Sequence, residues 1–124
     1  MNFEIVKKET YTLVTSKVEK LDTHSATDLK TEFVAISNTL ERNIIIDLSA
    51  TRYCDSSGLN AILTGNRLCK NSKGSFIITG LNTSIKKIIS ISQLNKVLKI
   101  IPTLPEAIDY LFMEEIERQL DDQE

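Results

Sequence analysis

The spacing of apolar residues changes several times along the chain, and each change predicts a new element. Residues 2–8 and 10–16 alternate between apolar and polar positions, which predicts two short strands joined by a turn. After Ser25 the apolar residues recur every three or four positions, which predicts a helix with one buried face. These positions are Ala26, Leu29, Phe33, Ile36 and Leu40. Ser25, followed by Asp28 three residues later, is expected to cap this helix.

The rest of the chain repeats a strand followed by a helix. Residues 44–48, 75–79 and 97–101 are apolar runs, and the first two are typical of strands covered on both faces. Helical spacing follows each run, in residues 58–69, in residues 85–89 and from Leu104 onward. Two pairs of residues support the last helix. Thr103 with Glu106 forms a capping box, and Glu114 with Arg118 has the spacing of an ion pair.

This element order predicts an α/β fold. The order is β-β-α-β-α-β-α-β-α, and strands that alternate with helices pair largely in parallel. The N-terminal hairpin adds an antiparallel edge, so we expect a small mixed sheet flanked by about four helices. No linker or repeat divides the sequence, which predicts one domain over residues 1–118. Residues 119–124 are acidic and are expected to fray.

Composition removes several classes of function. The 124 residues carry a formal net charge of −2, which argues against a nucleic-acid partner. With one histidine and two cysteines, the chain is poor in metal ligands, and we expect no metal, no cofactor and no catalytic residues. His24 lies in a polar stretch and is interpreted as a surface residue. Cys54 and Cys69 are interpreted as free thiols, since a chain of this size needs no disulfide.

Two further observations concern location and binding. The N-terminus has no basic segment followed by an apolar run, and no apolar stretch approaches the roughly 20 residues of a membrane span. We therefore expect a cytoplasmic protein without a membrane span. A basic cluster lies in the last third of the chain, and a solvated surface is its simplest interpretation. Contact with a nucleotide or another anion remains the alternative for these residues, which are Lys86, Lys87, Lys96 and Lys99.

The segment Asp55-Ser56-Ser57-Gly58 is the strongest candidate for a functional site. It follows a buried strand and leads into a helix, and ligands of open α/β sheets bind at the carboxyl ends of strands. Asp55, Ser56 or Ser57 could simply cap the helix, but a cap needs only one such residue. From the residues alone, a functional site and a helix cap are equally supported.

These residues resemble the STAS domain, the family of sulfate-transporter and anti-sigma-factor-antagonist modules. The resemblance spans nearly the whole chain and is closest to the stand-alone bacterial antagonists. The segments that carry it are Leu21–Ala26, Ile45–Ser49, Asp55–Leu59, Gly80 and Pro102–Ala107.

The resemblance implies a switch operated by other proteins. In those antagonists an anti-sigma factor that is also a serine kinase of the ATP-binding type phosphorylates the second serine of the motif, and a serine phosphatase reverses it. Ser57 would be the acceptor here. The residues expected to contact the partner are Asp55, Ser56, Gly58, Leu59 and Asp22.

Two other functions remain open. The chain could be a STAS subunit of a larger assembly, such as a lipid-transport ATPase complex or a stress-signalling scaffold, in which the same patch binds without phosphorylation. An enzyme that uses Ser56 or Ser57 as a nucleophile is disfavoured because no histidine lies near them in the sequence. We therefore expect a binding module and not an enzyme.

Overall fold

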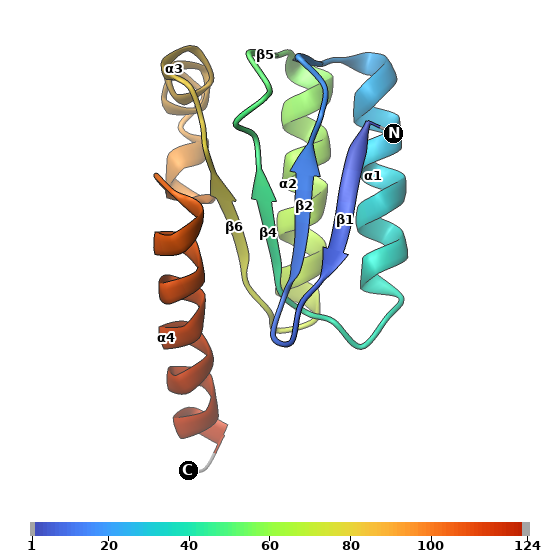
Figure 1. The fold of residues 1–124 in the computed structure, drawn as a ribbon. Helices are drawn as coiled ribbons and strands as arrows, with labels where there is room; N and C mark the ends of the chain where they lie inside the picture. Colours follow the sequence, from blue (N-terminus) through green and yellow to red (C-terminus); the bar gives the residue numbers. More distant parts are fainter. Residues whose placement is uncertain (1, 123–124) are drawn as a thin grey trace.

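A five-stranded mixed sheet forms the centre of the molecule. The computed structural model describes residues 2–122. The strand order is β1-β2-β4-β6-β7, in which only the β1–β2 pair is antiparallel (Figure 1). The strands are β1 (Phe3–Lys7), β2 (Thr12–Ser16), β4 (Ile44–Asp47), β6 (Phe76–Thr79) and β7 (Lys99–Ile101). The predicted fold class is confirmed, including the antiparallel hairpin at the edge.

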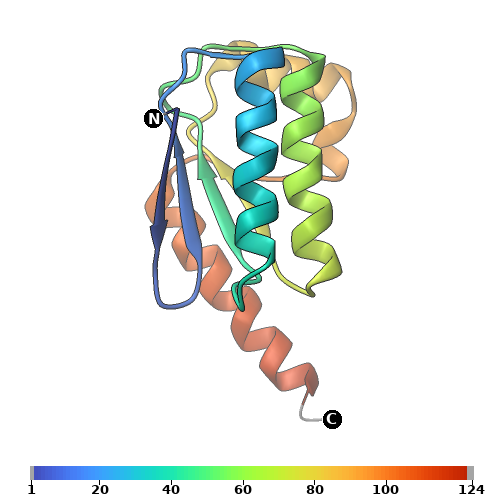
Figure 2. The same ribbon diagram turned by 90° about the vertical axis from the view of Figure 1, so that its right-hand side faces the viewer.

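Helices cover both faces of this sheet. α1 and α2 lie side by side on one face, and α4 lies on the other (Figure 2). The helices are α1 (Thr23–Ser37), α2 (Ser56–Asn71), α3 (Thr83–Ile91) and α4 (Leu104–Asp122), and a short 3₁₀ helix, η1 (Leu94–Lys96), precedes β7. No helix within residues 2–122 is long and apolar enough to cross a membrane.

Alternating side chains of the central strands build two cores. Ile44 and Ile46 of β4 pack with the apolar faces of α1 and α2, whereas Ile45 between them packs with Ala107 and Leu111 of α4. A strand with helices on both faces has no polar side, which explains the unbroken apolar run in the sequence. The predicted helix face is buried except for Leu40, which is fully exposed because α1 ends at Ser37.

The start of α1 differs from the sequence prediction. Asp22 is the N-cap, and its carboxylate accepts hydrogen bonds from the backbone N–H groups of His24 and Ser25. The Ser25 hydroxyl in turn accepts from the Asp22 N–H at 2.9 Å, which completes a capping box. Asp28 instead accepts a hydrogen bond from the Asn2 side chain. The expected cap at Ser25 and Asp28 was wrong because Asp22 and Ser25 offer the same three-residue spacing one turn earlier.

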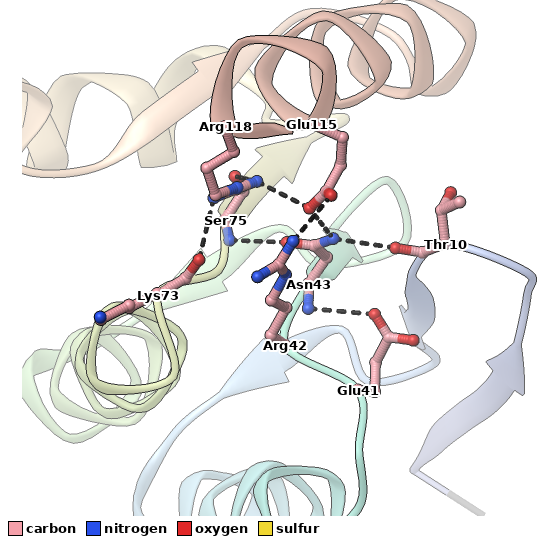
Figure 3. Close-up of polar contacts among 8 residues, drawn as sticks. All are labelled: Thr10, Glu41, Arg42, Asn43, Lys73, Ser75, Glu115 and Arg118. Carbon is pink, nitrogen blue, oxygen red and sulfur yellow. Dashed lines mark hydrogen bonds and ion pairs between the residues drawn. The ribbon is translucent and has the colours of Figure 1, made fainter. Parts of the chain in front are cut away.

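Arg118 pairs with Glu115 and not with Glu114. Its Nη2 lies 2.9 Å from Glu115 Oε1 and also 2.9 Å from the Ser75 hydroxyl (Figure 3). Glu115 also accepts hydrogen bonds from the Asn43 amide at 2.7 Å and from Arg42 at 3.0 Å. The predicted pair with Glu114 satisfied helix spacing alone, whereas Glu115 contacts residues that precede β4 and Arg118 contacts residues that precede β6. This network fastens α4 to the sheet.

Two further strands are too short to predict from sequence. β3 (Lys20–Leu21) and β5 (Tyr53–Cys54) pair in parallel as a separate two-stranded sheet. At the other end of the chain, α4 continues through residues 119–122. The fraying expected for residues 119–124 stays a prediction, and residues 123–124 lie outside the described part of the chain.

Candidate functional site

The Asp55–Leu59 segment forms the first turn of α2. Asp55 is the N-cap, and its Oδ1 accepts a hydrogen bond from the Gly58 N–H at 3.0 Å. Ser56 and Ser57 are the first two residues of the helix, where backbone N–H groups have no partner inside the helix. The capping interpretation is therefore correct for Asp55. It gives no role to the hydroxyl groups of Ser56 and Ser57.

The β3–β5 pair brings the Asp22 segment beside this turn. Leu21 lies opposite Cys54, and the Asp55 N–H donates to the Leu21 carbonyl oxygen at 3.2 Å. Because each short strand leads directly into a helix, α1 and α2 begin next to each other. The hydroxyl of Ser57 lies 3.3 Å from the hydroxyl of Thr23, the first residue of α1. Ser57 therefore stands between two helix N-termini.

Gly58 permits this close approach. A Cβ built on Gly58 would overlap the Leu21 carbonyl oxygen and lie 2.7 Å from the Cys54 sulfur. Real side chains do not tolerate such contacts, so any larger residue would push the two segments apart. The glycine of the motif thus sets the distance between the starts of α1 and α2.

The predicted site residues come together but differ in exposure. Ser56 is exposed, whereas Ser57, Asp55 and Asp22 are half-buried. Gly58 is buried, and Leu59 is half-buried with its side chain packed against the core. The surface that a partner could touch is therefore formed by the two carboxylates and the two serines, with Gly58 and Leu59 beneath it. We call these four residues, Asp22, Asp55, Ser56 and Ser57, the switch patch.

The electrostatics of the switch patch favour negative charge. The backbone N–H of Ser25 is the main cause that lowers the pKa of Asp22, and the N–H of His24 adds to it. The N-terminus of each helix carries a positive partial charge, and two such ends meet here. His24 is exposed, in agreement with its interpretation as a surface residue. A further anion would find unpaired backbone N–H groups nearby.

The thiol of Cys54, next to the switch patch, is not activated as a nucleophile. Burial, with a smaller contribution from the Asp55 carboxylate, raises the pKa of Cys54 to about 12. Burial likewise raises the pKa of Cys69 to about 12. Both thiols therefore stay protonated near neutral pH, and a protonated thiol is a poor nucleophile. Both cysteines are free, as the sequence predicted.

Sequence reasoning missed one residue beside the switch patch. Thr23 supplies the hydroxyl next to Ser57. Thr23 follows Asp22 directly, but its partner lies 34 residues away, and no local pattern signals that contact.

Two lysines of the basic cluster identified in the sequence, Lys86 and Lys87 of α3, are exposed.

Solved structures of similar fold include two anti-sigma factor antagonists. The Mycobacterium paratuberculosis antagonist is 20% identical, with a TM-score of 0.78, over 88% of this chain and 92% of that chain. The Planctomyces limnophilus antagonist (STAS) domain protein is 15% identical, with a TM-score of 0.79, over 88% and 96% of the two chains.

A third structure is the phosphorylated form of the Bacillus cell fate determinant SpoIIAA. It is 20% identical, with a TM-score of 0.68, and the match covers 87% of this chain and 97% of that chain. At these identities the three structures establish a shared fold. The family itself is identified by the model of the STAS domain, which matches residues 2–107 and so includes the hairpin, the switch patch and the first turn of α4. The chain therefore belongs to the STAS domain family.

Proposed function

We propose that this protein is an anti-sigma factor antagonist, a binding module released from its partner by phosphorylation of Ser57. The observation that carries the proposal is the convergence of two helix N-termini on the Ser57 hydroxyl, beside the Thr23 hydroxyl at 3.3 Å. The proposal draws further support from the STAS motif and from the antagonists that share the fold.

The fold should accept a phosphate at this position. Phosphoserine adds about −1.5 to −2 charges and three strong hydrogen-bond acceptors. At the second residue of α2, these oxygens would meet free backbone N–H groups and the positive end of the helix dipole. The Thr23 hydroxyl is close enough to donate a further hydrogen bond. We therefore expect phosphorylation to leave the domain folded.

Binding should respond differently. The switch patch already carries the carboxylates of Asp22 and Asp55. A partner face that accommodates a neutral serine would meet added bulk and about two more negative charges. Like-charge contacts and desolvation in an interface cost several kcal/mol, and a cost of this size lowers the affinity strongly. A local modification can thus control binding without a change of fold.

Other proteins would supply the chemistry of this cycle. The proposed partners are an anti-sigma factor that acts as a serine kinase of the ATP-binding type, and a serine phosphatase. Because the kinase would use ATP, we propose that the exchange takes place in the cytoplasm. The protein itself is proposed not to be an enzyme, because the group near the Ser57 hydroxyl is another hydroxyl and the Cys54 thiol is protonated.

Calorimetric titration against the ATP-binding anti-sigma factor kinases of the same genome tests this proposal. We expect one of them to bind the wild type and to bind Ser57→Asp at least about tenfold more weakly, a difference of about 1.4 kcal/mol. Ser84→Asp is the matched control, because Ser84 is exposed and is also the second residue of a helix, α3. It should bind as the wild type does. Equal affinity of Ser57→Asp and wild type would contradict the switch and favour a non-switching STAS subunit of a larger assembly.

A further inference from the structure

α4 carries a surface that lies largely outside the matched family model. The model ends at residue 107, whereas α4 runs from Leu104 to Asp122. The C-terminal part of the helix extends past the lower edge of the sheet in both views (Figures 1 and 2). Arg118 attaches one side of the helix to Glu115 and Ser75. The other side is exposed and therefore available to a partner.

Four large apolar side chains of α4 are exposed. Phe112, Ile116 and Leu120 follow each other at intervals of four residues, which places them on one side of the helix, and Met113 adjoins them. Phe112 leaves 63% of its surface exposed, Leu120 59% and Met113 55%. The opposite side of α4, with Ala107 and Leu111, is buried against the sheet.

The charge of this segment is strongly negative. Residues 103–124 contain eight acidic residues and one basic residue, a net charge of −7, which leaves a net charge of +5 on residues 1–102. The single basic residue, Arg118, is already engaged by Glu115. Glu117 and Asp121 are exposed. We call the four apolar residues together with Glu117 and Asp121 the acidic stripe.

A second surface of the same chain has the complementary character. Ile91 at the end of α3 leaves 75% of its surface exposed, and Val97 just before β7 is also exposed. Three exposed lysines lie near them in the sequence. Lys87 lies one helical turn before Ile91, Lys96 adjoins Val97, and Lys99, whose Nζ lies 5.0 Å from the centre of the Tyr110 ring, begins β7. We call these five residues the basic surface. Exposed apolar residues framed by charge are typical of protein interfaces.

We propose that the acidic stripe of one copy docks on the basic surface of a second copy of this chain. Apolar side chains meet in such a contact, and carboxylates face lysines, which gives charge complementarity. Two α4 helices packed on each other would instead bring Glu117 and Asp121 of each copy close to the same acids of the other, and like charges oppose such contacts. The contact joins two different surfaces, so it can extend to chains or rings. It includes no residue of the switch patch and is independent of the proposed function.

Sedimentation analysis of the full chain over a range of concentrations tests this interface. The monomer mass is 14.0 kDa, and we expect the average mass to rise with concentration at about 50 mM salt and to fall toward the monomer at about 500 mM salt. A mass of 14.0 kDa at every concentration would overturn the proposal.

Charge reversal identifies the two surfaces. Glu117→Lys/Asp121→Lys and Lys87→Glu/Lys96→Glu should each be monomeric alone, and an equimolar mixture of the two variants should associate again. The control Glu9→Lys/Glu19→Lys makes the same change of net charge as Glu117→Lys/Asp121→Lys, at exposed positions outside both surfaces, and should associate as the wild type does.

Three results would contradict the proposed contact. If Lys87→Glu/Lys96→Glu associates like the wild type, then α4 pairs with something other than the basic surface. If the control is also monomeric, net charge and not a specific interface governs association. If Leu120→Gln, an exposed substitution on α4, leaves the average mass unchanged, the acidic stripe is not the contact.

Discussion

The hydroxyl oxygens of Ser57 and Thr23 lie 3.3 Å apart, although 34 residues separate them in the sequence. Each belongs to the first turn of a helix, and each helix follows one strand of the two-stranded β3–β5 sheet. The contact explains how two loops distant in sequence become one surface. Its geometry depends on Gly58, Asp22 and Asp55, and the contributions of Gly58 and Asp22 can be tested separately.

Gly58→Ala should destabilise the domain. In an ordinary helix, alanine is favoured over glycine by about 1 kcal/mol. Here the added Cβ would overlap the Leu21 carbonyl and approach the Cys54 sulfur at 2.7 Å, and overpacking of this kind costs about 1 to 3 kcal/mol. Urea denaturation measures whether the substitution lowers the free energy of unfolding, with Ser56→Ala as the exposed control. A Gly58→Ala variant more stable than the wild type would show that α1 and α2 are not held this closely.

The contribution of Asp22 to stability should depend on pH. Its pKa is lowered in the folded state, chiefly by the hydrogen bond from the Ser25 N–H, so the ionised form stabilises the fold. This contribution is complete above the unfolded pKa of about 3.9 and is lost as the pH falls through the lower folded pKa.

Asp22→Asn keeps a capping side chain but removes this charge. Thermal unfolding between about pH 2 and pH 7 should therefore show the wild type more stable at neutral pH and the difference shrinking below about pH 4. A difference that stays constant over this range would contradict an ionised cap at Asp22.

Glu115→Ala should weaken the attachment of α4, whereas Glu114→Ala should have little effect. Burial raises the pKa of Glu115, but hydrogen bonds from Asn43 and Arg42 outweigh it and the pKa is lowered overall. Removing this carboxylate takes away a charged acceptor from both the Asn43 amide and Arg118, at a cost of about 1 to 3 kcal/mol. The Glu114 change should stay within about 0.5 kcal/mol. If both variants lose the same free energy of unfolding, the result would contradict the role of Glu115 and favour the pair of Glu114 with Arg118 that helix spacing predicts.

Both cysteines should resist alkylation in the native protein. Cys54 and Cys69 are buried, and their pKa values of about 12 leave little thiolate near neutral pH. A thiol reagent should modify both residues rapidly in urea and much more slowly in buffer, as followed by intact mass. Rapid native labelling of Cys54 would indicate that the start of α2 opens readily, since its sulfur lies next to Gly58.

The sequence predicted the order of the main elements because each apolar run and each helical spacing is a local signal. Ile45 illustrates this. Successive side chains of a strand point to opposite faces of the sheet, so an apolar residue between two buried neighbours packs in a second core. The choice of Asp22 over Ser25 as the helix cap was missed because both residues are good caps and spacing alone does not separate them.

The remaining differences depend on contacts between distant segments. The β3–β5 pair has two residues in each strand, too few for any periodicity, and it is stabilised by hydrogen bonds such as Asp55 N–H to Leu21 O. The partners of Thr23 and Arg118 likewise follow from how the helices pack and not from their own sequences. The motif indicated the α2 part of the candidate site, and the tertiary structure shows its contact with Thr23 at the start of α1.

Site mapping by mass spectrometry shows whether Ser57 is the phosphate acceptor. Wild type, Ser56→Ala and Ser57→Ala would each be incubated with ATP and the ATP-binding anti-sigma factor kinases of the same genome, and the phosphopeptides sequenced. Ser56 is the sharp control, because it is more exposed than Ser57 and would be modified if accessibility alone decided. We expect one phosphate on Ser57 in the wild type and in Ser56→Ala, and none in Ser57→Ala. Phosphorylation of Ser57→Ala at the wild-type level, or no phosphate on the wild type with any of these kinases, would contradict this expectation.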